Sequence, residues 1–461
     1  MNQAVVSTPA PLTRARSSLL LTGLALGYFI VLLDTTIVTV ALPAIRLNLG
    51  GGLHGLTWVA NAYTMVYASL LLGMGSLSDR YGAKRVFLAG LTAFALASVL
   101  SAAASSLGML IALRAILGIG GAAILPAALT IIAQTFTDPQ QRARALGISA
   151  AVSGLALAAG PVLGGFLVDA FGWPSIFLVN VPVAIAAFVL VSRNRLDPAR
   201  RGSGSGFDLA GQLTSILAVA AITCGIMEGA QWGWSSTPTF AMLAGGAALL
   251  LLFARIERRS ASPMLPFSLF RSSVVSGGMA AGFLVNFGFS AALFLLTLYF
   301  QNELGHSARL TGLDFLAMTL PMAIVPMYMG SIVKRFGAGR SIGAGFLIAA
   351  AGLAILTFTP ANAGYAVTIP ALCMIGCGLA LVLPALMSSV IAAAPQGTAG
   401  IASGALNAFR QLGATMGVAF CGVLLDANAL FADAWVRTLG VTSLLFVAGA
   451  GVAYRYLRPR G

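Results

Sequence analysis

Three charged side chains stand inside long apolar runs of the sequence. Asp34, Arg114 and Arg410 each lie well within a run made mainly of Ala, Leu, Ile, Val and Gly. A charge in the middle of a membrane costs about 2.5–3.5 kcal/mol on insertion scales, so a charge kept there usually serves a function. A buried carboxyl group beside an arginine can bind and release a proton when the arginine moves, because its pKa depends on burial and on the neighbouring charge.

Asp34 and Arg114 are predicted to lie at one depth. Asp34 is about seven residues before the outer end of the first run, and Arg114 is about seven residues after the outer start of the fourth run, which crosses in the opposite direction. At a rise of 1.5 Å per residue, both lie roughly 10 Å below the outer face. We therefore predict that they form the proton-coupling pair. The alternative is a static ion pair that only fixes helix packing.

Two further charges are candidates with open roles. For Arg410, substrate binding, a structural bond to backbone carbonyls and a part in coupling all remain open. Glu228, with Trp232 close by, is a possible second acidic site, and a solvated helix end is the alternative.

The composition explains why these charges are exceptional. Of 461 residues, 59% are hydrophobic and 8% are charged, whereas a soluble domain carries about 25% charged residues. Fourteen apolar runs, from 19–41 to 435–457, are long enough to cross a bilayer, and only helices satisfy the backbone of such runs in lipid. The predicted fold class is an all-α polytopic membrane protein with 14 transmembrane helices.

The placement of basic residues predicts the orientation. With a cytoplasmic N-terminus, nearly all of the 26 Lys and Arg residues fall on the cytoplasmic side, and the outer loops hold only Arg46, Arg309 and Arg437. Both termini are therefore predicted to be cytoplasmic, and the net charge of +14 faces anionic lipid rather than nucleic acid. The Ala-, Gly- and Arg-rich composition indicates a bacterial cell membrane.

The chain repeats itself. Three blocks recur in the same order at nearly the same separation: residues 75–83 as 330–338, 118–127 as 376–385, and 160–169 as 417–426. We therefore predict an N-terminal six-helix bundle over 1–200 and a C-terminal one over 265–461. These are parallel repeats related by an axis along the membrane normal. Residues 201–264 are predicted to form a two-helix insert with its linkers.

Three motifs connect the sequence to a known family: Leu33-Asp34-Thr-Thr-Ile-Val-Thr39-Val-Ala-Leu-Pro43, the loop Gly75-Ser-Leu-Ser-Asp79-Arg80-Tyr-Gly82-Ala-Lys84-Arg85, and Gly160-Pro161-Val-Leu-Gly164-Gly165. With them the chain resembles the major facilitator superfamily, in its 14-helix drug:proton antiporter branch, where the third motif marks exporters. Two departures are Thr39, where the family usually has Asn, and Lys334, where the second loop commonly has Asp.

The resemblance and the residues together predict roles. The loop is expected to be an inner gate made of Gly75, Asp79, Arg80, Gly82 and Arg85, the alternative being topogenic charge with a turn. The small residues Gly160, Pro161, Gly164 and Gly165 are expected to form a pivot or outer seal, or else ordinary membrane packing. The resemblance places some amphipathic groups at a substrate cavity, with packing or an interface belt as the alternative: Trp58, Asn61, Tyr63, Asn286, Phe287, Asn407, Arg410 and Gln411.

The predicted function is proton-coupled export of amphipathic drugs or toxic compounds by alternating access, and not an enzymatic reaction. Its expected partners are a small lipophilic or amphipathic molecule, protons and the lipid bilayer, with the chain acting as a monomer and without cofactor or metal. A dedicated exporter of one endogenous metabolite or antibiotic is the alternative. An intramembrane enzyme is a remote one, because it needs a catalytic cluster that the three deep charges do not supply.

Overall fold

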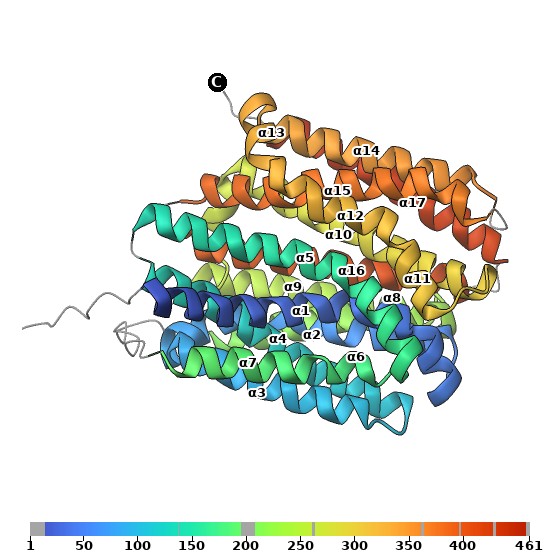
Figure 1. Ribbon diagram of the computed structural model, residues 1–461, viewed down its shortest axis with the longest axis horizontal. Helices are drawn as coiled ribbons and strands as arrows, with labels where there is room; N and C mark the ends of the chain where they lie inside the picture. Colours follow the sequence, from blue (N-terminus) through green and yellow to red (C-terminus); the bar gives the residue numbers. More distant parts are fainter. Residues whose placement is uncertain are drawn as a thin grey trace, which may run out of the picture.

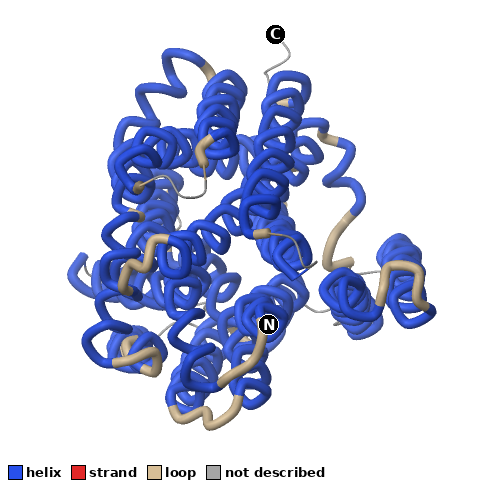
Figure 2. The backbone as a smooth tube through the Cα atoms, turned by 90° about the vertical axis from the view of Figure 1, so that its right-hand side faces the viewer, coloured by secondary structure: helices blue, strands red, loops and turns tan. Residues whose placement is uncertain are grey.

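The computed structural model describes residues 14–136, 138–194, 208–260, 263–360, 364–395, 398–426 and 430–457. Within these residues the chain is almost wholly helical and contains no strand. The helices run roughly parallel to one another (Figure 1), and a view turned by 90° looks along most of them (Figure 2). An all-helical fold is therefore confirmed for the described part of the chain.

The first part of the chain contains α1 (Arg14–Leu49), α2 (Leu53–Tyr81), α3 (Ala83–Ala102), α4 (Leu107–Thr135), α5 (Pro139–Phe171), α6 (Ser175–Leu178) and α7 (Asn180–Ser192). The middle contains α8 (Leu209–Trp232) and α9 (Thr237–Arg259). The last part contains η1 (Phe267–Arg271), α10 (Ser273–Leu298), the π-helix η2 (Tyr299–Glu303), α11 (Ala308–Asp314), α12 (Leu316–Ile324), η3 (Val325–Tyr328), α13 (Met329–Phe336), α14 (Ala338–Phe358), α15 (Tyr365–Ala393), α16 (Ala399–Asp426) and α17 (Phe431–Tyr456).

Thirteen segments of the described chain are long and apolar enough to cross a membrane. Of the fourteen predicted spans, the second, α2, is not among them; this helix carries polar residues such as His54, Asn61 and Thr64. The exact number of fourteen therefore stays a prediction. The predicted span 310–332 is divided into α11, α12, η3 and α13, and Pro321 and Pro326 fall within this divided stretch, where each lacks a backbone donor.

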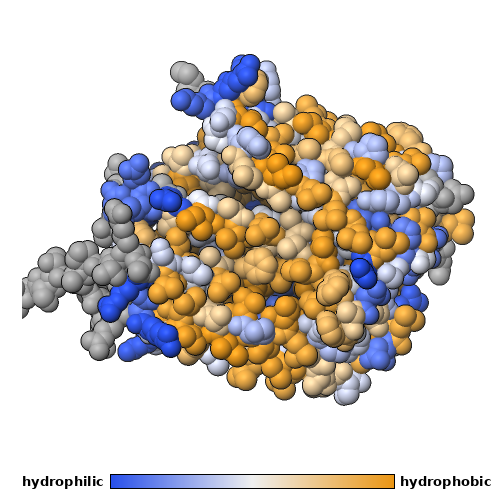
Figure 3. All heavy atoms as spheres, in the orientation of Figure 1, coloured by the Kyte–Doolittle hydropathy of each residue, from blue (hydrophilic) through white to orange (hydrophobic). Residues whose placement is uncertain are grey.

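The surface fits a multi-pass membrane protein. Large apolar side chains are exposed on the helices, among them Phe358 at 87%, Leu251 at 74% and Leu444 at 70%. In Figure 3 apolar residues cover the middle of the visible face, and hydrophilic residues gather toward the left and right sides of the molecule. Soluble monomers rarely expose so much contiguous apolar surface, whereas lipid tails cover it.

Helices from the first and last parts of the chain meet along two seams. α2 packs against α16 in one seam, and α5 packs against α11 and α12 in the other. α8 lies against both α2 and α16, and α9 packs mainly on α8. The boundary predicted at residues 200 and 201 lies outside the described residues, and the division into two bundles and an insert remains a prediction.

The repeated loop uses its glycines as expected. Gly82 ends α2 and begins α3 with φ of +93°, and Gly337 ends α13 and begins α14 with φ of +81°. A residue with a Cβ atom is strained in this left-handed region, so the turn requires glycine in both copies. We call the end of the molecule that carries these two turns the basic end, because Arg80, Lys84 and Arg335 lie beside them.

Candidate functional site

Asp34 of α1 and Arg114 of α4 form an ion pair in the interior. The guanidinium Nη1 donates to Asp34 Oδ2, and the two side chains are 0% and 1% exposed. Arg114 Nε donates to the carbonyl of Val59 on α2 at 3.1 Å, and its guanidinium stacks over the Tyr63 ring at 4.8 Å. An arginine with these partners is well satisfied away from water, because its charge and donors are used on several sides.

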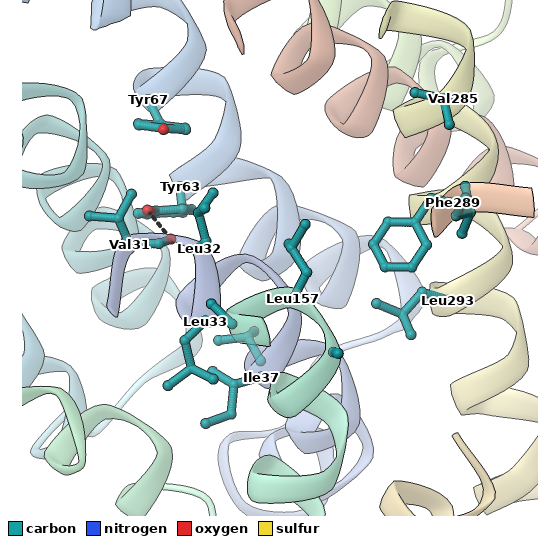
Figure 4. Close-up of a cluster of buried hydrophobic side chains, with 14 of the residues drawn as sticks. Val31, Leu32, Leu33, Ile37, Tyr63, Tyr67, Leu157, Val285, Phe289 and Leu293 are labelled. Atoms are coloured by element: carbon teal, nitrogen blue, oxygen red, sulfur yellow. Dashed lines mark hydrogen bonds between the residues drawn. The ribbon is translucent and has the colours of Figure 1, made fainter. Parts of the chain in front are cut away.

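Further polar groups tie this pair to neighbouring helices. Asn180 Nδ2 lies 3.5 Å from Asp34 Oδ1 and 3.5 Å from Ser98 Oγ of α3. The Tyr63 hydroxyl donates to the carbonyl of Val31 at 2.8 Å, which is the dashed line in Figure 4. The carboxylate therefore sits where α1, α2, α3, α4 and α7 meet. Sequence reasoning missed Asn180 and Ser98, because neither carries a signal beyond being polar in an apolar run.

A cavity lies between helices of the first and last parts of the chain. Its polar lining consists of Thr35, Thr36, Thr39, Thr64, Asn286, Ser290, Arg410 and Gln411. Its apolar lining consists of Leu32, Ala60, Leu157, Phe289, Leu293, Phe294, Leu379, Leu383, Ala414 and Val418. Figure 4 shows Leu157 of α5 opposite Phe289 and Leu293 of α10. A mostly apolar pocket with a few polar groups is typical of a small-molecule site.

The ion pair and the cavity share α1 and α2, but they lie on different faces of these helices. Leu32, Thr35 and Thr39 of α1 line the cavity, whereas Asp34 is absent from the lining and fully buried among α1, α2, α4 and α7. A proton on Asp34 therefore has no direct contact with a molecule in the cavity. An influence between the two sites can pass through the positions of α1 and α2, which contribute residues to both.

Arg410 of α16 is the one charged residue in the cavity lining of the described chain. Its Nε donates to Asn286 Oδ1 at 3.2 Å, and its Nη1 donates to Asn407 Oδ1 at 3.3 Å. Both partners are neutral amides. The guanidinium is thus oriented by hydrogen bonds, while its positive charge is not balanced by a carboxylate.

The predicted cavity residues separate into two groups. Asn286, Arg410 and Gln411 line the cavity, and Asn407 contacts Arg410. The other four do not line it. Tyr63 belongs to the ion-pair network, Phe287 packs on the rings of Phe283 and Phe420, and Trp58 and Asn61 contact α8. Spacing could not separate these groups, because helices buried all round lack an amphipathic period. The threonines of α1 and α2 were missed for the same reason.

Glu228 on α8 is placed at a helix contact. Its Oε1 accepts from Trp58 Nε1 at 2.9 Å and lies 3.0 Å from His54 Nε2, both on α2. Together with Asn61 Nδ2, which lies 3.4 Å from Met227 Sδ, these bonds attach α8 to α2. No residue of 208–256 lines the cavity.

Glu228→Gln is expected to leave transport nearly intact. The amide oxygen still accepts from Trp58, while the charge facing His54 is lost, and such partly exposed pairs contribute only about 0–1 kcal/mol. We expect efflux within about twofold of wild type and a small fall in thermal stability in detergent. Efflux assays at matched membrane levels measure this. A loss of coupling in this variant would make Glu228 the proton site instead.

The basic loop presents exposed charges at the basic end. Arg80 and Arg85 are exposed, and the Arg80 guanidinium lies 5.4 Å from the centroid of the neighbouring Tyr81 ring. The Asp79 side chain lies outside the described residues. A Cβ atom added at Gly75 would lie 4.0 Å from the Cβ atom of Pro126 on α4. The gate remains a prediction.

The Gly160–Gly165 motif lies where α5 touches two other helices. A Cβ atom at Gly160 or Gly164 would come within 3.1 Å or 2.8 Å of the backbone of Ile37 on α1. A Cβ atom at Gly165 would meet the backbone of Ala308, and one at Gly312 would lie 2.6 Å from the carbonyl of Pro161. Backbones this close require glycine. The motif therefore packs α5 against α1 on one side and α11 on the other.

The described helices enclose a mainly apolar cavity between the first and last parts of the chain, an arrangement that is typical of membrane transporters. The sequence profile of the Major Facilitator Superfamily matches residues 24–418, and the chain belongs to that family.

Over 414 residues the chain is 36% identical to the "Multidrug resistance protein Stp" of Mycobacterium tuberculosis, and the alignment covers 89% of this chain and 76% of that protein. Over 445 residues it is 34% identical to the "Methylenomycin A resistance protein" of Streptomyces coelicolor, covering 96% of this chain and 93% of that protein. The solved structure of the nucleoside transporter NupG (D323A mutant) has the same fold, with a TM-score of 0.65, 11% identity, and 95% of this chain and all of that chain covered.

Proposed function

We propose that the protein is a proton-coupled exporter of amphipathic small molecules in a bacterial cell membrane, with the basic end and both termini in the cytoplasm. The observation that carries the proposal is the fully buried Asp34–Arg114 pair, which shares α1 with the cavity. Relatives named for multidrug resistance and for methylenomycin A resistance support export as the direction of transport.

Protonation of Asp34 changes the bonds that hold α1. The neutral carboxyl group no longer attracts Arg114 as an ion, while Arg114 keeps the Val59 carbonyl and the Tyr63 ring. The new O–H group is a donor, and the Asn180 amide oxygen, which has no hydrogen-bond partner in the described structure, can accept it after the amide rotates. α1 is then attached to α7 more than to α4.

Movement of α1 links the proton to the substrate. Thr35 and Thr39 on α1 face the cavity, so a shift of this helix changes the contacts that the cavity offers. The close contacts of α5 with α11 then open or close as the two parts of the chain rock. A proton entering from outside drives one direction of this movement, and the substrate leaves as the halves return.

Transport in inverted membrane vesicles tests the proposal. Compounds are first chosen from the resistance profile of cells that express the protein. Each compound should accumulate in inverted vesicles when the lumen is acidified, and addition of the compound should release protons from the lumen. Accumulation that is unchanged when the proton gradient is collapsed would refute the coupling.

Export of a single antibiotic is the second candidate. Relatives are named "Methylenomycin A resistance protein" and "Tetracenomycin C resistance and export protein", each after one compound. The same resistance profile separates the two readings, because a dedicated exporter protects against one chemical series only.

Arg80→Ala is expected to slow transport about five- to tenfold without reducing the amount of protein in the membrane, which corresponds to a loss of about 1–1.4 kcal/mol of coupling free energy. The reason is that the loop at Gly82 joins α2 and α3 at the basic end, where the gate is proposed. Arg259→Ala, an exposed arginine of α9, is the matched control. Equal efflux by both variants would remove the gating role.

A further inference from the structure

The cavity holds a positive charge that the described protein does not neutralise. Arg410 bonds only to the amide oxygens of Asn286 and Asn407, and no carboxylate lines the cavity among the described residues. Asp34 is already paired with Arg114, and the other buried carboxylates of the described helices, Glu257 and Asp314, bond to backbone N–H groups and to His306. None of the three carboxylates balances the charge of Arg410.

A buried hydroxyl group lies next to the cavity lining on α2. Tyr67 is 0% exposed and follows Thr64, which lines the cavity, by three residues, so the two lie on neighbouring positions of one helix face. The Tyr67 hydroxyl is buried and has no hydrogen-bond partner in the described structure. A buried hydroxyl that donates to nothing costs free energy, so an acceptor from a bound molecule would satisfy it.

An unpaired arginine at this depth is unfavourable unless something compensates it. The two amides lower the cost by accepting its N–H groups, but they supply no negative charge. They also orient the planar guanidinium, whose fork geometry matches a carboxylate. These features are those of a site prepared for an anion.

We propose, on the basis of the exporter function proposed above, that the substrate is an amphipathic anion. A carboxylate, or an ionised phenol or enol, binds Arg410 of α16, and the apolar body of the molecule lies against Phe289, Leu293 and Leu157. A lipophilic cation is disfavoured in the same cavity, because it would meet a like charge without a carboxylate to offset it.

The charge of the substrate has a consequence for the driving force. One proton moving inward and one monoanion moving outward shift charge across the membrane in the same sense. A one-for-one exchange therefore moves two elementary charges per cycle, whereas exchange of a proton for a monocation moves none. Export is thus driven by the membrane potential as well as by the pH gradient. Since Asp34 does not line the cavity, the anion does not contact the carboxyl group, and coupling runs through α1 and α2, which belong to both sites.

Binding of a matched dye series to the full-length protein in detergent tests the charge preference. Dansylglycine, dansylamide and dansylcadaverine share one fluorophore and are anionic, neutral and cationic. Energy transfer from tryptophan reports their affinity. We expect dansylglycine to bind about tenfold or more tightly than dansylcadaverine, as a charge-assisted hydrogen bond to arginine implies. Equal binding, preference for the cation, or no binding of any dye counts against the proposal.

Substitution of Arg410 tests whether this residue causes the preference for the anionic dye. Arg410→Gln should weaken dansylglycine about tenfold while changing dansylamide little, and Arg410→Lys should keep part of the preference. Arg455→Gln, which removes one exposed charge from α17, should leave all affinities unchanged. If Arg410→Gln proves unstable, Tyr67→Phe replaces it, with a smaller loss confined to dansylglycine. Dansylglycine affinity that is unaffected in both variants overturns the assignment.

Transport currents separate this inference from the exporter proposal. In proteoliposomes, transport of an anion that binds the protein should rise when the membrane potential is negative on the side that the basic end faces. This is an inside-positive potential if the basic end faces the bath, and an inside-negative potential if it faces the lumen. If cationic compounds are instead exported in a proton-dependent way and Arg410→Gln has no effect, only the anion assignment fails. If no compound is transported in a proton-dependent way, the exporter function itself fails.

Discussion

Asp34→Asn is expected to reduce proton-driven accumulation of substrate in inverted vesicles to the level of vesicles without the protein. The amide has nearly the shape of the carboxyl group and still offers an oxygen to Arg114, but it cannot bind and release a proton. Asn180 and the Val59 carbonyl keep their places beside the pair. The variant should therefore fold and insert while the cycle loses its coupling step.

Substrate binding gives the discriminating measurement for this variant. Because Asp34 does not line the cavity, affinity in detergent should stay within about threefold of wild type, a change of less than 1 kcal/mol. Asp433→Asn, which neutralises an exposed carboxylate in the first turn of α17, is the matched control. Continued uphill transport by Asp34→Asn would show that the coupling proton binds elsewhere. Loss of binding together with transport would favour the static ion pair.

Gly165→Val is expected to reduce efflux at least about tenfold, with a destabilisation of roughly 1–3 kcal/mol from overpacking. A Cβ atom at this position would meet the backbone of Ala308 on α11, and Gly312 of the same helix is also close. Backbone atoms cannot rotate away as a side chain can. The added methyl groups therefore force α5 and α11 apart at the seam between the two parts of the chain.

A second glycine of the same helix provides the control. A Cβ atom at Gly147 on α5 would have nothing within 4 Å, so Gly147→Val should keep efflux near the wild-type level. Both variants carry the same propensity change in a helix, and only the seam contact differs. Efflux at matched membrane levels and thermal unfolding in detergent measure the effect. Unchanged efflux in Gly165→Val would remove this seam from the transport cycle.

The position of the buried ion pair could be predicted because depth is a one-dimensional property. A helix in a membrane rises by 1.5 Å per residue, so counting from the ends of two runs placed Asp34 and Arg114 at one level. Asn180 and Ser98 could not be found in the same way. Their contact with each other and with Asp34 depends on how α3 and α7 pack against α1, and no local pattern records this.

The cavity was the least predictable part. Asn286, Arg410 and Gln411 were expected there and line it, whereas Trp58 and Asn61 were also expected and instead hold α8. Polar residues in membrane helices face either a cavity or a neighbouring helix, and both choices satisfy them. Residue type and spacing alone therefore do not distinguish the two.

The sequence by itself determined that this is an all-helical, multi-pass membrane protein with an internal repeat and that its few deep charges lie at particular depths, because these properties follow from hydropathy, chain length and order. Only the tertiary structure decided which face of each helix meets which neighbour: that Thr35 faces the cavity while Asp34, one residue away, faces Arg114. In water, an amphipathic period reveals the buried face of a helix. Buried helices surrounded by other helices and lipid are apolar on all sides, so rotation about the helix axis is set by packing alone.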